Sequence, residues 1–227
     1  MLSQLLSGNF DLQSIIAEIL AVLLIVFLIL PFHEWAHAFT ASLLGDKSIR
    51  YRGRLTFNPL NHVDPVGALC LLLFGFGWAK PVPVDSRNFK NPKLGMAITA
   101  IMGPVANVLA ALVGMIVLKC IMFFNFAFLF TDIGGFVYTF LQFYISCNVG
   151  LAVFNLIPVP PLDGSKVLFL FLPDKAVDFC YRYQQIFFIV LFALLYTNIL
   201  DIPLSWAVNG IYSGLDWVAS LPFKLFS

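Results

Sequence analysis

Long apolar runs are the feature that most limits what this chain can fold into. Each of four runs is long enough to cross a bilayer as a helix, which takes roughly 20 residues. They lie at about 15–44, 94–124, 134–157 and 176–200. Hydrophobic residues make up 60% of the 227 residues and charged residues only 11%, too few to cover an ordinary soluble domain. The sequence therefore predicts an all-α polytopic membrane protein.

Two further segments set the expected number of membrane helices at about four to six. Segment 66–79 is short and contains glycines, so it fits a re-entrant hairpin better than a full crossing. Segment 203–222 has one apolar and one polar helical face, as expected of an interface helix or of a last span beside a polar groove. No stretch is left for a soluble accessory domain.

The distribution of charge predicts topology and argues against nucleic-acid binding. The net charge is +1, and the thirteen basic residues are spread over short loops without a long basic face. Basic residues flank segment 66–79 on both sides, so we expect both flanks to face the cytoplasm and the N-terminus to lie outside. The first residues lack the basic region of a signal peptide, so the first span is expected to stay in the mature protein.

Segment 49–57 alternates apolar and polar residues with the period of a β-strand. We interpret it as a short membrane-associated β segment. It would form either a small sheet lying on anionic headgroups or an edge on which an extended peptide pairs through its backbone.

The stretch PFHEWAHA, at 31–38, places His33, Glu34 and His37 within the first apolar run. On a helix, residues four apart share a face, so both imidazoles can reach one metal ion. A carboxylate beside them can take a proton from water, and HExxH is the metallopeptidase arrangement of these roles. The alternative, helix-end residues satisfied by hydrogen bonds, leaves the cost of ionisable groups at membrane depth unexplained. Pro31 also predicts a kink here.

A catalytic zinc site usually has three protein ligands and one open position, so a third ligand is required. The remaining histidine, His62, lies in the predicted cytoplasmic loop and is the weaker candidate. Asp163 follows three prolines at the end of an apolar span, and broken helices at membrane depth line cavities. Asp163 can equally be a plain helix N-cap, so the residues alone leave this choice open.

Three motifs together resemble the site-2 protease family of intramembrane zinc metalloproteases. They are HEWAH at 33–37, GPVANVLAAL at 103–112 and NLIPVPPLDG at 155–164. The likeness covers about 15–172, the expected metalloprotease core, to which 173–227 adds C-terminal helices within a single membrane domain over 1–227. The chain resembles the compact bacterial and archaeal branch, and we expect neither a PDZ nor a CBS domain.

The resemblance implies one zinc ion per chain, bound by His33, His37 and Asp163, with Glu34 as general base and acid. It assigns Asn155 to substrate binding, and Asn107 either to substrate binding or to a hydrogen bond between helices. It implies a zinc-dependent endopeptidase that cleaves transmembrane segments of substrate proteins. The expected location is the bacterial cytoplasmic membrane, with the active site toward the cytoplasmic side.

Two other classes of protein remain as alternatives. A catalytically inactive membrane adaptor would keep the fold and the metal, but it would have no need for Glu34. A metal transporter also places histidines and carboxylates at membrane depth, but it needs several polar sites along a route across the bilayer. Outside the motifs the spans offer few such residues.

Overall fold

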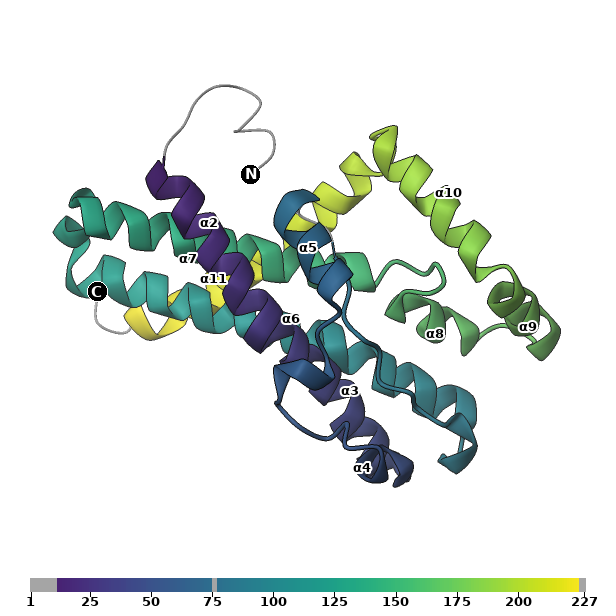
Figure 1. The fold of residues 1–227 in the computed structure, drawn as a ribbon. Helices are drawn as coiled ribbons and strands as arrows, with labels where there is room; N and C mark the ends of the chain where they lie inside the picture. The colour runs from purple at the N-terminus through teal and green to yellow at the C-terminus, as the bar shows by residue number, and fades with distance from the viewer. Residues whose placement is uncertain (1–11, 75–76, 225–227) are drawn as a thin grey trace.

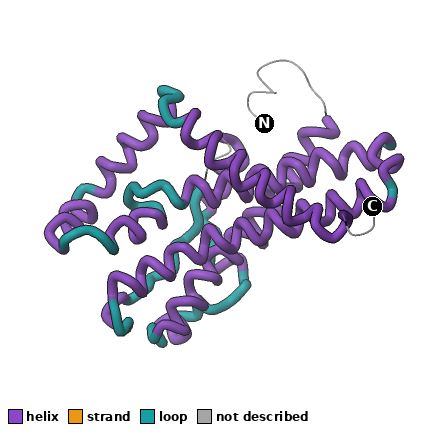
Figure 2. Tube along the Cα trace, turned by 180° about the vertical axis from the view of Figure 1, so that it is seen from behind, coloured by secondary structure: helices purple, strands orange, loops and turns teal. Residues whose placement is uncertain are grey.

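The computed structural model describes residues 12–74 and 77–224, so 1–11, 75–76 and 225–227 lie outside the described part. Within that part the chain is helical and contains no strand (Figure 1, Figure 2). The helices are α2 (Leu12–Leu24), α3 (Leu30–Leu44), α4 (Ser48–Tyr51), α5 (Pro65–Phe74), α6 (Pro92–Phe124), α7 (Asp132–Asn155), α8 (Asp163–Phe169), α9 (Asp174–Arg182), α10 (Gln184–Tyr196) and α11 (Asp201–Lys224). Shorter turns are η1 (Ile25–Ile29, π-helical), η2 (Pro59–Asn61), η3 (Ser86–Asn88) and η4 (Phe126–Phe130).

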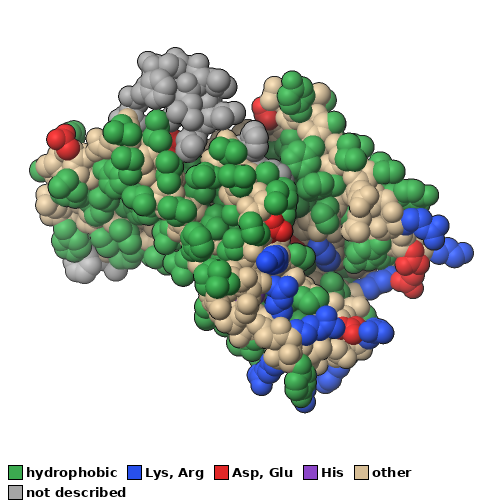
Figure 3. Space-filling view, in the orientation of Figure 1, with side chains coloured by type: hydrophobic (Ala, Val, Ile, Leu, Met, Phe, Trp, Pro, Cys, Tyr) green, Lys and Arg blue, Asp and Glu red, His purple; other side chains and the backbone are tan. Residues whose placement is uncertain are grey.

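Three continuous helical stretches are long and apolar enough to cross a membrane. They are Leu12–Leu44, Pro92–Phe124 and Asp132–Asn155. A fourth crossing exists if α9 and α10 count as one broken span. The described residues thus form an all-α polytopic membrane protein with three or four crossings, the lower end of the expected number. Figure 3 shows apolar side chains over most of this face, whereas lysines and arginines gather around α3, α4 and α9.

The first span continues through a π-helical turn directly before the histidine motif. Pro31 has no N–H to donate to the carbonyl four residues earlier, which disturbs the hydrogen-bond ladder at this point. The wider turn of η1 lies where that ladder is disturbed, and α3 then continues regularly to Leu44. The predicted kink is therefore a local change of helix type, and His33 stays within the span.

Helix α6 organises the bundle, because it packs against α3, α7, α8 and α11. Its small residues allow close approach, as is common between membrane helices. A Cβ on Gly114 would lie 2.8 Å from the Tyr144 ring of α7. Ile25, Met115 and Ile145, from three different elements, are almost completely buried in the core that results.

The prediction of a strand over 49–57 is wrong. The chain forms α4 there and then continues as a loop. A local hydrogen bond favours the turn at the start of α4, because Asp46 Oδ1 accepts from the Ser48 N–H at 3.1 Å. The alternating pattern also marks no common face, since Ile49 is buried whereas Tyr51 is 90% exposed.

Within segment 66–79 the structure describes the short helix α5 and residues 77–79, which lie against it. The helix has ten residues, about 15 Å at 1.5 Å per residue, which is too short to cross a bilayer. The chain comes back to its starting point, where Val63 and Ala79 form an isolated antiparallel bridge. A Cβ on Gly67 would lie 2.1 Å from Trp78 O, so the glycine lets the returning chain pass against the helix. The described residues thus return on themselves, as the predicted hairpin requires.

The run at 176–200, expected to be long enough to cross the bilayer, is bent, because α9 and α10 meet at an angle of 70°. The two helices form a crossing only as one broken span. α9 carries the charged residues Asp174, Lys175, Asp178 and Arg182, which favour the membrane surface. α10 is apolar but has only thirteen residues, about 20 Å of helix. The change in polarity at the junction accounts for the break.

The predicted amphipathic helix over 203–222 is confirmed as α11. It packs against α6 and α7, and its apolar face buries Leu215 and Ala219. Its polar face joins the core through an ion pair between Lys119 Nζ and Asp216 Oδ1 at 2.6 Å. Tyr212 also donates a hydrogen bond to Gln142 Oε1 at 2.8 Å.

Candidate metal centre

The two histidines of the HEWAH motif lie on one face of α3 and are buried inside the bundle. Each ring is oriented through its Nδ1 atom. His33 Nδ1 lies 3.2 Å from Asn107 Oδ1, and His37 Nδ1 lies 2.8 Å from Thr99 O. Both partners are acceptors, so each Nδ1 carries the hydrogen and each Nε2 keeps a lone pair that a metal ion can bind.

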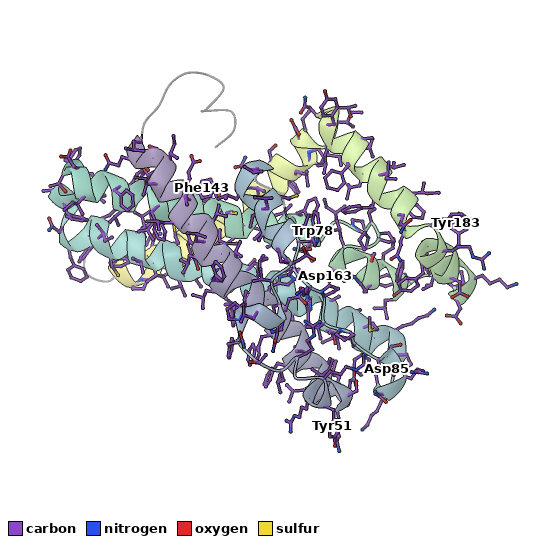
Figure 4. All side chains as sticks on the ribbon, viewed as in Figure 1. Tyr51, Trp78, Asp85, Phe143, Asp163 and Tyr183 are labelled. Carbon is purple, nitrogen blue, oxygen red and sulfur yellow. The ribbon has the colours of Figure 1, made fainter. Side chains whose placement is uncertain are left out.

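Asp163 completes a cluster of three with these histidines. Its Oδ2 lies 3.3 Å from His33 Nε2 and 3.2 Å from His37 Nε2, and the two Nε2 atoms lie 3.0 Å apart. In a tetrahedron with metal bonds of 2.0–2.1 Å, neighbouring ligands lie about 3.3 Å apart. The donor atoms and their spacing therefore fit one zinc ion with a fourth position left open. Figure 4 shows Asp163 in the middle of the molecule.

The connection between α7 and α8 places Asp163 and holds its second oxygen. A Cβ on Gly164 would lie 2.1 Å from Leu156 O, so a glycine is needed for α8 to start so close to the end of α7. Lys166 Nζ donates to Pro161 O at 2.7 Å and lies 3.7 Å from Asp163 Oδ1. With Oδ1 facing the lysine, Oδ2 is left facing the histidines.

Gly103 provides the room for the imidazoles against α6. A Cβ at this position would lie 2.5 Å from His33 Nε2 and 2.4 Å from His37 Nε2. Real Cβ atoms essentially never approach so closely, so any side chain here would displace the rings. α6 thus contributes to the centre in two ways, with an acceptor from Asn107 and with the space left by Gly103.

Glu34 is buried beside the cluster, but its carboxylate has a different partner. The backbone N–H of Val82 donates to Glu34 Oε2 at 3.0 Å. Val82 belongs to the connection between α5 and α6, whose residues 80–85 form neither helix nor strand. The carboxylate is therefore held by one amide hydrogen bond. Glu34 also lines a cavity, described next, that His33 and Asp163 line as well.

A cavity of about 410 Å³ opens beside the cluster, between α3, α7, α8, α10 and the segment 77–81. Its wall is mostly apolar, with residues such as Leu30, Trp78 and Phe154. Asn155, the last residue of α7, also lines it and donates a hydrogen bond from Nδ2 to Leu151 O at 3.0 Å. The cavity thus offers a few polar groups in apolar surroundings, the usual composition of a small-molecule or peptide site.

The structure brings His33, His37 and Asp163 together, with Glu34 and Asn155 at the same cavity. Asp163 is not the N-cap of a helix, the alternative left open by the sequence, because Leu162 is the N-cap of α8 and Asp163 is its first residue. The other predicted residues lie apart from the cavity. Asn107 is fully buried behind His33, and His62 is fully buried with Nε2 2.9 Å from Thr56 O.

Three groups at the centre were missed by reasoning from the sequence. They are the carbonyl of Thr99, the amide of Val82 and the side chain of Lys166. The first two are backbone groups, which carry no sequence signal. Lys166 has one weak signal, because it follows Asp163 by three residues and so lies on the same side of a helix.

The chain is similar to known proteins along most of its length. Residues 130–197 match the profile of peptidase family M50. The "Putative zinc metalloprotease YwhC" of Bacillus subtilis strain 168 is 37% identical over 206 residues, which are 90% of this chain and 90% of that protein. The "Putative zinc metalloprotease Rip2" of Mycolicibacterium smegmatis is 27% identical over 190 residues, 82% of this chain and 69% of that protein. No solved structure shows a significant match.

Proposed function

This chain belongs to peptidase family M50, and we propose that it is an intramembrane zinc endopeptidase that cleaves transmembrane segments of substrate proteins. The observation that carries the proposal is the convergence of two histidines and an aspartate within a bundle of membrane-length helices. Buried ionisable groups at membrane depth are costly and are usually functional. The proposal takes residues 1–227 as a single membrane domain, with the catalytic core over about 15–172.

Zinc is the cofactor, one ion per chain, and in our proposal His33, His37 and Asp163 hold it. When bound, zinc makes water nucleophilic near neutral pH and stabilises negative charge on a carbonyl oxygen. The residues around it act by orientation. Asn107 and the carbonyl of Thr99 hold the two rings, and Lys166 holds the outer oxygen of the aspartate.

Glu34 is the proposed general base and acid. It accepts a proton from the attacking water and returns a proton to the leaving amine when the peptide bond breaks. Its position supports this role, because its carboxylate borders the cavity beside the cluster and has an amide donor instead of a cation as its partner. A non-catalytic adaptor would have no use for a buried carboxylate in this place.

The substrate must present an unwound segment to this centre. A helical peptide hides its scissile amide within its own hydrogen bonds, so it has to open locally before attack. In our proposal Asn155, at the wall of the cavity, binds the carbonyl of the opened peptide. One of its amide hydrogens is already bonded to Leu151 O, which fixes the direction of the other.

Beyond Ala79, the segment 79–85 can assist substrate binding only as a hydrogen-bond acceptor. Pro81 and Pro83 have no N–H. The other N–H groups of 80–85 donate hydrogen bonds within the protein. Lys80 donates to His62 O, Val82 to Glu34, Val84 to Val82 O and Asp85 to Asp46. An extended peptide lying here would therefore have to donate its own N–H groups to the segment's carbonyls.

The proposed location is the bacterial cytoplasmic membrane, with the centre toward the cytoplasmic side. The loops nearest to it carry most of the basic residues, as expected of cytoplasmic loops. His37 lies seven residues before the end of α3 at Leu44, about 10 Å at 1.5 Å per residue. This short distance supports a centre that lies within the bilayer near one face.

The test is cleavage of membrane proteins in reconstituted vesicles. Wild type and Glu34→Gln would each be mixed with a bacterial membrane fraction, and new peptide termini within transmembrane segments would be identified by mass spectrometry. We expect Glu34→Gln to retain zinc and to lose at least about a hundredfold of the cleavage rate. The matched control is Glu18→Gln, the same change at the chain's other glutamate, which should cleave like wild type. Equal cleavage by Glu34→Gln and wild type would contradict the proposal.

A further inference from the structure

The turn after α3 is bound to the turn before α6 through one buried carboxylate. Asp46 is completely buried. Its Oδ2 accepts a hydrogen bond from the Asp85 N–H at 2.8 Å, and its Oδ1 accepts one from Asn88 Nδ2 at 2.8 Å. On its own side, Oδ1 also accepts from the Ser48 hydroxyl at 2.6 Å and the Ser48 N–H at 3.1 Å.

The two turns are also in direct backbone contact. Gly45 has φ of +121°, and a Cβ there would lie 2.8 Å from Asn88 O. Below this contact a small apolar cluster joins the same elements, with Ala38 and Ala41 of α3 packed on Phe89 and with Val82 at its edge. Asp46 therefore binds a segment that is already seated on α3, and it fixes the last few residues of that segment in register.

The segment held in this way carries the amide that faces Glu34. Val82 precedes Asp85 by three residues, and its N–H donates to Glu34 Oε2 at 3.0 Å. The chain between them is stiff, because Pro83 fixes one φ angle and Val84 N donates to Val82 O at 3.0 Å. A shift of Asp85 is therefore transmitted to Val82 and from there to the carboxylate of Glu34.

We propose that Asp46 is a positioning residue for the peptidase reaction: it anchors the segment 79–88 so that the Val82 amide orients the Glu34 carboxylate. The inference rests on the proposed function for its catalytic consequence, but the anchor itself is a feature of the described contacts. Asp46 belongs neither to the three-residue cluster nor to the lining of the cavity. Its effect on turnover is predicted to pass entirely through the segment.

Asp46→Asn is the sharpest variant, because it changes one oxygen into an amide group of the same size. With its oxygen toward Ser48 and Asn88, the new side chain keeps three of the four hydrogen bonds and places an N–H₂ against the Asp85 N–H. A donor then faces a donor. The segment should move away, while the hydrogen bonds with Ser48 at the start of α4 stay intact.

The matched control is Ser48→Ala, which removes a hydrogen bond from the same carboxylate but leaves both contacts with the segment. It separates the loss of a hydrogen bond to the segment from the loss of a hydrogen bond between Asp46 and Ser48 at the start of α4. We expect Asp46→Asn to lower kcat by about 10- to 100-fold. Ser48→Ala should stay within about twofold of wild type.

The experiment measures kcat, KM and zinc content for wild type and both variants, together with hydrogen exchange of the 79–91 peptide. The inference predicts for Asp46→Asn a loss mainly in kcat, full zinc content and faster exchange of that peptide. It is overturned if Asp46→Asn keeps wild-type kcat and exchange, if it loses zinc, or if Ser48→Ala is impaired as strongly. Hydrogen exchange needs no substrate, so an exchange rate of the 79–91 peptide that is unchanged in Asp46→Asn overturns the anchor by itself. If wild type cleaves no substrate, that result counts against the proposed function and not against the anchor.

Discussion

At the scale of single residues, the orientation of the two histidine rings decides whether the cluster can bind a metal. Among the described residues, Asn107 is the side chain that holds His33 Nδ1. We predict that Asn107→Ala weakens zinc binding by about 10- to 100-fold, because the ring loses the partner that fixes its tautomer. Competition with a chelator measures the change.

The control for this prediction is Asn148→Ala, which removes another fully buried asparagine from the same core. Asn148 donates to Tyr144 O of its own helix and does not belong to the three-residue cluster. Its loss should therefore lower stability without changing zinc affinity. Equal zinc affinity in Asn107→Ala and wild type would mean that the ring is held by packing alone.

Gly103 gives a steric test of the same centre. In Gly103→Ala the methyl group would lie within 2.5 Å of both Nε2 atoms, so we predict that the purified variant contains little or no zinc. Gly150→Ala on α7 is the control, because nothing lies within 4 Å of the added Cβ. It should bind zinc like wild type. Elemental analysis distinguishes the two, and full zinc content in Gly103→Ala would show that the rings can move aside.

Asp46 predicts a dependence of stability on pH. Burial raises the pKa of its carboxyl, but the hydrogen bonds from Ser48, the Asp85 amide and Asn88 outweigh burial, so the pKa lies below its usual 3.8. A lowered pKa in the folded protein means that the stabilisation is present above about pH 4 and is lost as the pH falls further.

We predict that Asp46→Asn is less stable than wild type by about 1–3 kcal/mol at pH 7. The difference should stay constant from about pH 8 to 5 and shrink below about pH 4, which thermal unfolding in detergent would measure. A difference that persists unchanged in stronger acid would contradict this cause.

Some of these residues could be selected from the sequence and others could not. His33, Glu34 and His37 share one short motif, and Asp163 follows a proline-rich break, so their residue types and spacing are enough to suggest chemistry. Their roles as ligands and base stay predictions. Partners that are backbone atoms, such as Thr99 O, could not be predicted. Nor could the proposed anchoring of the segment 79–88 by Asp46, because such contacts arise only when segments distant in sequence meet.

At the scale of helices and loops, α11 is held to the bundle by polar contacts as well as by its apolar face. Lys119 and Asp216 form an ion pair at 2.6 Å whose side chains are 24% and 46% exposed. Breaking such a partly buried pair is expected to cost more stability than breaking a surface pair and less than breaking a fully buried one. We predict that Asp216→Lys lowers the unfolding free energy by about 1–2 kcal/mol and that adding Lys119→Asp restores part of it.

Thermal unfolding of wild type, the two single variants and the double variant in detergent measures this coupling as a double-mutant cycle. Recovery in the double variant is the expected sign of a direct pair. Additive losses would mean that each charge contributes to the stability of its own helix only.

The helices that were predicted well are those whose apolar length alone requires a membrane, such as α6 and α7. The wrong strand over 49–57 and the bend within 176–200 both arose where short-range effects decide the structure. Over 49–57 the period-two pattern was real, but the hydrogen bond from the Ser48 N–H to Asp46 favours a helical turn, in which Tyr51 is exposed. At the junction of α9 and α10 the charges of α9 keep that helix from continuing the apolar span.

At the scale of the whole molecule, the fold encloses one polar centre in an apolar bundle. The class of the fold followed from composition, because a chain with 60% hydrophobic residues has no soluble alternative. The convergence of α3, α6 and α8 on one point did not follow from composition or from pattern. It depends on glycines such as Gly103 and Gly164, whose close contacts are visible only in three dimensions.

The central claim is that His33, His37 and Asp163 bind one zinc ion beside a carboxylate that acts in catalysis. The most direct test is the zinc content of the purified protein, by elemental analysis, for wild type, His33→Ala, Asp163→Ala and Glu34→Gln. We predict about one zinc per chain in wild type and in Glu34→Gln, and almost none in the two other variants. Zinc that is retained in Asp163→Ala, or absent from wild type after reconstitution with the metal, would contradict the claim.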